Sequence, residues 1–175
     1  DIFERYERFS STLKSIEYDY GNLLEFARAH EYYGIHFDSF RNGWVYREWA
    51  PQAFNLFLTG DFNYWNRYSH PLKRDHRGDW EIFLPYHDYK DSFLHGSKVK
   101  VHIEGKNGAL DRIPAYIRRV EQNLETHDFT GQLWFPEKEF DWTDHGFDPS
   151  ENLKQPLIYE CHVGMAQEKL GVGTY

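Results

Sequence analysis

The chain begins with the hydrophobic pattern of an amphipathic helix. Apolar side chains recur every three or four positions from Phe3 to Ile16, with charged residues between them. This spacing places the apolar side chains in one stripe along a helix. Gly21 and Asn22 then interrupt the pattern, and a second short helix is expected to end near Gly34. Because such a small hairpin does not fold alone, we expect its stripe to pack on the next domain.

The following part of the chain has the shorter period of β-strands. Apolar and polar side chains alternate in short runs, and Gly, Pro, Asp or Asn residues separate the runs. The runs span residues 34–40, 42–51, 53–62, 79–85, 97–105 and 112–120. Pro114 restricts the last run to a sheet edge or a bulge. Since no helical pattern lies between the second and fourth runs, we predict a mainly β protein, an immunoglobulin-like antiparallel β-sandwich rather than a βαβ fold.

The C-terminal part loses this alternation and then ends in an apolar run. Residues 121–156 contain several Gly and Pro residues but many aromatic side chains, which predicts an extended strap packed against a surface. Residues 156–165 (PLIYECHVGM) are almost continuously apolar, as buried parallel strands are. A parallel strand needs a crossover connection, and none follows this run. We therefore interpret the chain as a fragment that ends just after the first strand of a larger α/β domain.

Composition and charge narrow the classes of partner. The length of 175 residues is enough for a core, and an aromatic content of 19% argues against disorder for most of the chain. A net charge of −8 disfavours nucleic acid and anionic membranes as partners. No apolar run approaches the roughly 18 residues of a membrane helix, and the charged start lacks a secretory core, so we expect a cytoplasmic location. The single cysteine, Cys161, excludes an internal disulfide and is expected in the core.

The candidate chemistry of the sequence is aromatic. The sequence contains no phosphate loop, no G-x-S-x-G and no H-E-x-x-H motif, and its ten histidines show no helical metal spacing, so we expect no metal and no cofactor. Trp49 precedes Ala50 and Pro51, and Trp65 lies in a polar turn. An indole face can stack on a pyranose ring while amides and a lysine bond its hydroxyls. Core packing and protein contacts are the alternative uses of these indoles.

Several motifs, in order along the chain, resemble a known family. Residues 45–65 (VYREWAPQAFNLFLTGDFNYW), continued by NRYSHPLKR and GDWEIFLP, are similar to carbohydrate-binding module family 48. This β-sandwich precedes the catalytic barrel in α-amylase-superfamily enzymes and also forms the glycogen-binding domain of the AMP-activated protein kinase β subunit. The segments YERFSSTLKSI, EYYGIHF, HGSKVKV, DRIPAYIRRV and LIYECHVGMAQE extend the resemblance to eukaryotic 1,4-α-glucan (glycogen or starch) branching enzymes. The EWAP and GDFN-x-W motifs alone also fit debranching enzymes.

The resemblance implies a domain organisation and an activity. It implies a helical segment at 1–34, the module at 35–125, and the strap with the first strand of a truncated barrel at 126–175. The parent enzyme would cleave an α-1,4 bond and transfer the chain to a C6 hydroxyl with two carboxylates and retention. These carboxylates lie on later barrel strands in the family, so we expect no catalytic residue here and no activity of this fragment alone. The expected partners are glycogen, amylose or maltooligosaccharides and the missing barrel.

The resemblance also implies two glucan-binding surfaces. A kinase-type site matches Trp65 and Lys100, but residues 106–108 (Lys-Asn-Gly) stand where that site has a second tryptophan. A groove of branching enzymes, which we favour over the Trp65 face, matches the EWAP turn and a hairpin glycine, with part of the helical segment beside them. We expect Trp44 and Trp80 in the core instead. The predicted carbohydrate-binding residues are Trp49, Pro51, Trp65, Lys100, Gly78, Arg77, Asp19 and Tyr20.

Two other hypotheses follow from the same residues. In one, the chain is a regulatory glycogen-binding module without catalysis. In the other, it is a structural β-sandwich that uses its aromatic side chains for protein contacts only.

The hairpin of the predicted groove departs from the family. Arg77 and Asp79 replace the tyrosine and lysine of the family, so the hairpin offers different side chains around Gly78.

Overall fold

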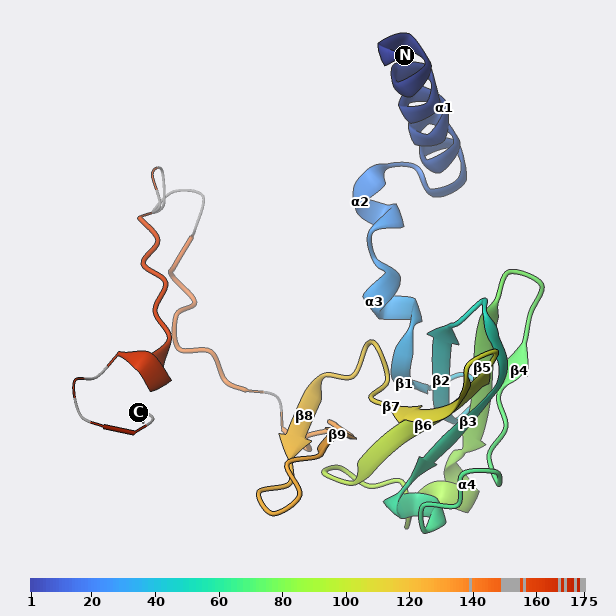
Figure 1. The fold of residues 1–175 in the computed structure, drawn as a ribbon, viewed down its shortest axis with the longest axis vertical. Coiled ribbons are helices and arrows are strands. Elements are labelled where there is room, and N and C mark those ends of the chain that lie inside the picture. Colours follow the sequence, from blue (N-terminus) through green and yellow to red (C-terminus); the bar gives the residue numbers. More distant parts are fainter. Residues whose placement is uncertain are drawn as a thin grey trace. The chain divides into compact units, whose positions relative to one another are not determined.

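A computed structural model describes residues 1–138, 140–148, 155, 157–166, 168, 170, 171 and 173. The chain divides into two compact units, Asp1–Glu137 and Lys138–Tyr175. The first unit holds all the described β-strands (Figure 1).

The N-terminal segment is helical, as its pattern predicts. It comprises α1 (Ile2–Tyr20), α2 (Leu23–Phe26) and α3 (Ala29–Tyr32). Asp1 caps α1 by accepting a hydrogen bond from the backbone N–H of Phe3, and Gly21 ends the helix at a φ of 85°. The expected packing of the apolar stripe is wrong for this structure, because no side chain of α1 is buried. The contacts of α1 are mainly with α2, and these do not cover the stripe.

Two antiparallel sheets form the sandwich, which confirms the predicted fold class. The first sheet has the order β1 (Gly34–Asp38), β2 (Gly43–Trp49), β5 (Asp79–Pro85) and β4 (Lys73–Arg74). The second has the order β3 (Ala53–Gly60), β6 (Lys98–Gly105), β9 (Phe129–Gln132) and β8 (Arg119–Gln122), and β7 (Gly108–Arg112) pairs with β6. The short elements η1 (Asp61–Asn63) and α4 (Tyr86–Tyr89) follow β3 and β5. Figure 1 shows β3 and β6 side by side.

The core fills the space between the two sheets. Trp44 and Trp80 are buried, as expected from the sequence. Along β6 the side chains of Val99 and Val101 enter the core, so Lys98 and Lys100 face the other side of the sheet. Each fully buried apolar side chain of this kind stabilises the fold by roughly 1.5–3 kcal/mol. The most deeply buried apolar residues are Tyr46, Leu56, Leu58, Leu84, Phe93, Val99, Val101 and Leu133.

The second sheet differs from the sequence prediction at two places. The sixth predicted run is not one strand, because Pro114 lies in the connection between β7 and β8. Proline has no N–H to donate, so it interrupts a ladder at this point. The sandwich also continues past residue 125, where its end was expected. Part of the predicted strap forms β9, and Leu133 enters the core.

The second unit begins after Glu137, and its described residues include no strand. Residues 157–162 have no assigned helix or strand, and η2 (Val163–Met165) follows them. Cys161 is exposed, so its expected place in a core is wrong for this structure. A strand needs a neighbour for its backbone N–H and C=O groups, and no strand pairing of these residues is found in the described part of the chain. The barrel strand therefore stays a prediction.

Candidate functional site

The turn after β3 holds Trp65 in an uncommon backbone conformation. Tyr64 and Trp65 both have positive φ, 55° and 60°. Residues other than glycine adopt this region only where their surroundings hold them there. The buried side chain of Asn63 does this: its Oδ1 accepts from the N–H of Gly60 at 3.0 Å, and its Nδ2 donates to the carbonyl of Asn66 at 3.0 Å. The turn is therefore a defined support for the indole.

The indole of Trp65 is fixed at its polar edge and partly open at its surface. Its Nε1 donates to Oδ1 of Asp61 at 3.0 Å. The other oxygen of Asp61 accepts from the backbone N–H of Lys98 at 2.7 Å, which ties the carboxylate to β6. The side chain of Trp65 keeps 38% of its surface exposed. The ring is thus oriented by hydrogen bonds while part of it remains available for contact.

Trp65 lies beside a polar pocket of about 390 Å³ on the outer side of the second sheet. This volume is within the range of about 300–1,000 Å³ that ligand pockets have. The structure therefore places Trp65 and Lys100 in the lining of one pocket. It adds residues that sequence reasoning missed. We call the pocket formed by these residues the Trp65 pocket: Trp65, Arg67, Lys98, Lys100, Asp111, Asn123, Thr126, Asp128 and Thr130.

Opposite charges in the Trp65 pocket are arranged in pairs. Nζ of Lys100 lies 2.6 Å from Oδ2 of Asp128, and Nη2 of Arg67 lies 2.7 Å from Oδ2 of Asp111. The hydrogen bond from Arg67 lowers the pKa of Asp111, and the hydrogen bond from Lys100 lowers the pKa of Asp128. Both carboxyl groups are therefore ionised at neutral pH. The pocket combines an aromatic surface with fixed donors and acceptors.

At the other end of β3, Trp49 stands on a surface that is built mainly from the backbone. It ends β2 with 60% of its side chain exposed. Pro51 follows in a turn, and Gly78 lies against it at a φ of 90°. A Cβ atom on Gly78 would come within 2.7 Å of the Cβ atom of Pro51, so only glycine permits this approach. Arg77 is exposed beside them. We call Trp49, Pro51, Arg77 and Gly78 the Trp49 rim.

Hydrogen bonds between the two turns hold the Trp49 rim together. The N–H of Ala50 donates to the carbonyl of Gly78 at 3.0 Å. The indole N–H of Trp80 donates to the carbonyl of Ala50 at 2.9 Å, and Arg74 donates to the carbonyl of Pro51 at 2.8 Å. The predicted residues Trp49, Pro51, Gly78 and Arg77 are thus brought together.

The predicted residues of the helical segment are not joined to this rim. Asp19 and Tyr20 are exposed at the end of α1. The ring of Tyr20 contacts Phe26 of α2, with 5.2 Å between the ring centroids. No hydrogen bond, ion pair or ring contact links either residue to the Trp49 rim in the described part of the chain. Their role as glucan contacts stays a prediction.

The Trp65 pocket and the Trp49 rim are separate surfaces. Trp49 precedes the start of β3 and Trp65 follows its end. Eight strand residues span about 26 Å at a rise of about 3.3 Å per residue. One glucose unit therefore cannot contact both indoles.

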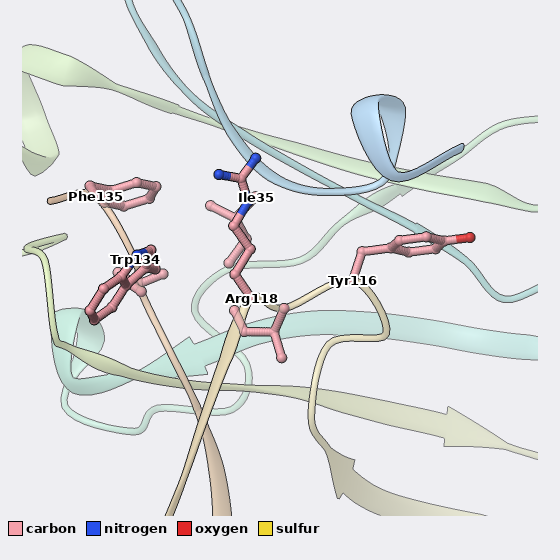
Figure 2. Close-up of a pocket in the computed structure, with 7 residues that line it drawn as sticks. Ile35, Tyr116, Arg118, Trp134 and Phe135 are labelled. Atoms are coloured by element: carbon pink, nitrogen blue, oxygen red, sulfur yellow. The ribbon is translucent and has the colours of Figure 1, made fainter. Parts of the chain in front are cut away.

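Two other hollows lie in the first unit, and the larger one shares Pro51 with the Trp49 rim. One of about 510 Å³ lies between residues 50–53 and the β6–β7 hairpin, without a tryptophan in its lining. The other, shown in Figure 2, has a volume of about 10 Å³, which is room for about one water molecule. In Figure 2, Trp134 and Phe135 lie on one side of it, and the ring of Tyr116 points away from them. Neither hollow presents an indole above a space large enough for a sugar ring.

No group of three or more His, Cys, Asp or Glu side chains in the described part of the chain is arranged to hold a metal ion. No helix among the described residues is long and apolar enough to span a membrane.

Comparison with protein families identifies the sandwich. Residues 32–117 match the model of carbohydrate-binding module 48 (isoamylase N-terminal domain). This part of the chain is thus similar to that family. The matched segment includes the whole Trp49 rim and, from the Trp65 pocket, Trp65 to Asp111. The pocket residues on the β8–β9 side of the module, from 123 to 130, lie beyond the match.

Curated relatives extend the similarity beyond the module. The chain is 40% identical to a 1,4-alpha-glucan-branching enzyme of Dictyostelium discoideum over 99% of its own length and 25% of the relative. It is 34% identical to the enzyme of that name from Rhizophagus irregularis, over 99% of this chain and 25% of the relative. It is 35% identical to the enzyme from Equus caballus, over 100% of this chain and 25% of the relative. The chain thus spans about a quarter of the length of these relatives and matches their N-terminal quarter, which confirms the resemblance found in the sequence.

Solved structures show a more distant similarity. The catalytic module of the pneumococcal glycogen-degrading virulence factor SpuA, in complex with an inhibitor, gives a TM-score of 0.48 at 15% identity, over 66% of this chain and 19% of that chain. A type I pullulanase from Bacillus subtilis complexed with maltose gives a TM-score of 0.46 at 17% identity, over 63% of this chain and 14% of that chain.

Proposed function

We propose that this chain is the glucan-binding part of a 1,4-α-glucan branching enzyme. The whole enzyme transfers α-1,4-linked glucan segments to a C6 hydroxyl and so forms α-1,6 branches in glycogen or starch. Identities of 34–40% with proteins of that name, over almost the whole chain, support this assignment. In this proposal the chain supplies binding, and the rest of the enzyme supplies the catalytic carboxylates. A cytoplasmic location, without nucleic acid or membrane partners, belongs to the same proposal and agrees with the net charge of −8.

The observation that carries the proposal is the fixed indole of Trp65 above a polar pocket. The C–H face of a glucose ring is apolar, and its rim carries hydroxyl groups. Trp65 offers a flat apolar surface, and the polar side chains from β6, β7 and β9 offer donors and acceptors for hydroxyl groups. The Trp49 rim is proposed as a second glucan surface, with Pro51 and Gly78 forming a platform beside an exposed indole. Arg77, Asp19 and Tyr20 are proposed as its further contacts.

Calorimetric titration of the chain with maltoheptaose tests this proposal. We expect Trp65→Ala to weaken binding roughly tenfold or more, because it removes a stacking surface worth on the order of 1.5–3 kcal/mol. We expect Trp49→Ala to weaken binding less in short glucans and more in long amylose that reaches both surfaces. Trp134→Ala is the matched control, since Trp134 has a similar exposure of 37% and lies outside both surfaces.

Two results would contradict glucan binding at these surfaces. One is a wild-type chain that shows no heat of binding with millimolar maltoheptaose. The other is an affinity that stays the same in the Trp65→Ala and Trp49→Ala variants, as a purely structural sandwich predicts.

A further inference from the structure

The Trp65 pocket contains a second planar group, the guanidinium of Arg67. Nε of Arg67 lies 3.0 Å from each carboxylate oxygen of Asp111, and Nη2 lies 2.7 Å from Oδ2. This two-sided contact fixes the plane of the guanidinium and not only its position. Arg67 therefore differs from an ordinary surface arginine, whose side chain samples many rotamers.

Asp111 is itself held by its cross-strand neighbour on β6, His102. Nδ1 of His102 lies 2.7 Å from Oδ1 of Asp111, and His102 is 95% buried. Since the carboxylate is ionised, Nδ1 carries the proton and donates it. The chain of contacts from His102 through Asp111 to Arg67 therefore lies along the outer face of the second sheet. It positions the guanidinium without help from a ligand.

The guanidinium keeps donors for a ligand. An arginine has five N–H groups, and the contact with Asp111 uses one on Nε and one on Nη2. Within the described part of the chain the other three N–H groups have no hydrogen-bond partner, and 53% of the side chain is exposed. The amine of Lys100 is less available, because it is bonded to Asp128 and its side chain is only 13% exposed. Arg67 is thus the cation of this pocket with both a fixed orientation and free donors.

We propose that Arg67 is a specificity-determining glucan contact: its free N–H groups donate to two adjacent hydroxyls of the glucose unit that stacks on Trp65. The proposal rests on the proposed function, because it assigns one residue to that binding site. Adjacent equatorial hydroxyls present two acceptor oxygens side by side, which matches the fork of a guanidinium better than the single point of an ammonium. Trp65 selects the face of the sugar ring, and Arg67 selects its hydroxyls.

The test measures maltoheptaose affinity of the full chain by calorimetry. We expect Arg67→Ala to weaken binding roughly tenfold, as two lost hydrogen bonds imply, and Arg67→Lys to restore only a small part of it. Arg41→Ala is the matched control: Arg41 is also paired with carboxylates, Asp38 and Glu81, but on the other sheet, and its loss leaves affinity unchanged. Thermal unfolding of each variant confirms that it is folded, and Arg67→Lys keeps a cation beside Asp111.

A double-mutant cycle locates the contact on the same glucose unit. If Trp65 and Arg67 bind one unit, Arg67→Ala has a smaller effect in the Trp65→Ala background than in the wild type. Fully additive effects would show that Arg67 contacts another unit or none, which overturns the proposal. Unchanged affinity of Arg67→Ala, with Trp65→Ala weakened, overturns the role of Arg67 and leaves the proposed function in place. A wild-type chain that does not bind overturns both.

Discussion

The two ends of β3 each present a tryptophan, but they support it by different means. At the Trp65 end, side chains hold the site together: Asp61 fixes the indole, and charged pairs link residues that lie far apart in the sequence. At the Trp49 end, the backbone holds the site together. Pro51 lies directly on Gly78, and backbone carbonyl groups accept the hydrogen bonds between the turns. The two surfaces can therefore be perturbed separately.

The availability of the indoles follows from this difference. Trp65 is 38% exposed and tied at its N–H edge, whereas Trp49 is 60% exposed above a rigid turn. A bound glucose unit at Trp65 therefore meets polar groups that are already oriented. At Trp49 the unit meets a flat surface, and hydroxyl contacts have to come from neighbouring side chains such as that of Arg77.

The largest expected effect is a loss of stability from a substitution in the core that both ends share. Leu58 is completely buried in β3, between the two surfaces. Leu58→Ala should lower the free energy of unfolding by about 2–5 kcal/mol, because it removes buried methyl groups and leaves a cavity. Urea unfolding followed by tryptophan fluorescence measures this loss. Leu124→Ala, at a site that is 87% exposed, should change it by no more than about 0.5 kcal/mol. Two separate transitions for the two ends would show that they do not share one core.

A substitution in the Trp49 rim is expected to have an intermediate effect on stability and to change glucan binding at that surface only. Gly78→Ala should cost about 1–3 kcal/mol, because alanine disfavours positive φ and its Cβ would overlap Pro51. It should also weaken glucan binding at Trp49 while the Trp65 pocket keeps its affinity.

Gly108→Ala is the matched control for this change. Gly108 also has positive φ, 108°, but nothing lies within 4 Å of the position of a Cβ. The difference between the two variants isolates the contact with Pro51. Equal losses of stability would mean that the approach of the two turns contributes nothing and that only backbone conformation matters.

The sequence predicted the elements whose pattern is local. Alternation located β2, β3, β5 and β6, since one face of each enters the core. It missed β4, β7, β9 and the second half of β8, which have only two to five residues and are defined by their partners. The run around Pro114 looked like one strand because alternation alone does not show which N–H groups a ladder needs.

The candidate site was predictable only in part for the same reason. Resemblance to a family pointed to Trp65 and Lys100, and the polar turn after β3 marked the indole independently. The partners of the pocket cations were not predictable, because Asp111 is 44 positions from Arg67 and Asp128 is 28 positions from Lys100. Only the pairing of β6 with β7 and β9 brings these side chains to one pocket. No local spacing encodes that neighbourhood.

The smallest expected effect is a pH dependence confined to the Trp65 end. Nδ1 of His70 lies 3.0 Å from Nδ2 of Asn63, the side chain that holds the Trp65 turn, and Nε2 of His70 lies 2.8 Å from the hydroxyl of Tyr89. A neutral ring can accept at Nδ1 from Nδ2 of Asn63 or from Oγ of Ser69, which lies 2.7 Å from the same nitrogen. Burial also lowers the pKa of His70 below its ordinary value of 6.5. The folded state therefore takes up this proton less readily than the unfolded state.

The sign of the pH effect follows from that difference. Above about pH 6.5 both states are neutral at this site and the stability is fully present. As the pH falls from 6.5 towards the lower pKa of the folded state, the unfolded state binds the proton first, so the free energy of unfolding decreases. Urea unfolding of the wild type and of His70→Gln at pH 7.5 and pH 5.5 gives the change in the free energy of unfolding of each protein between these pH values. The difference between the two changes is the contribution of His70. We expect the wild type to lose more stability than His70→Gln, and maltoheptaose binding at Trp65 to weaken with it. Equal responses would assign the pH dependence to other groups.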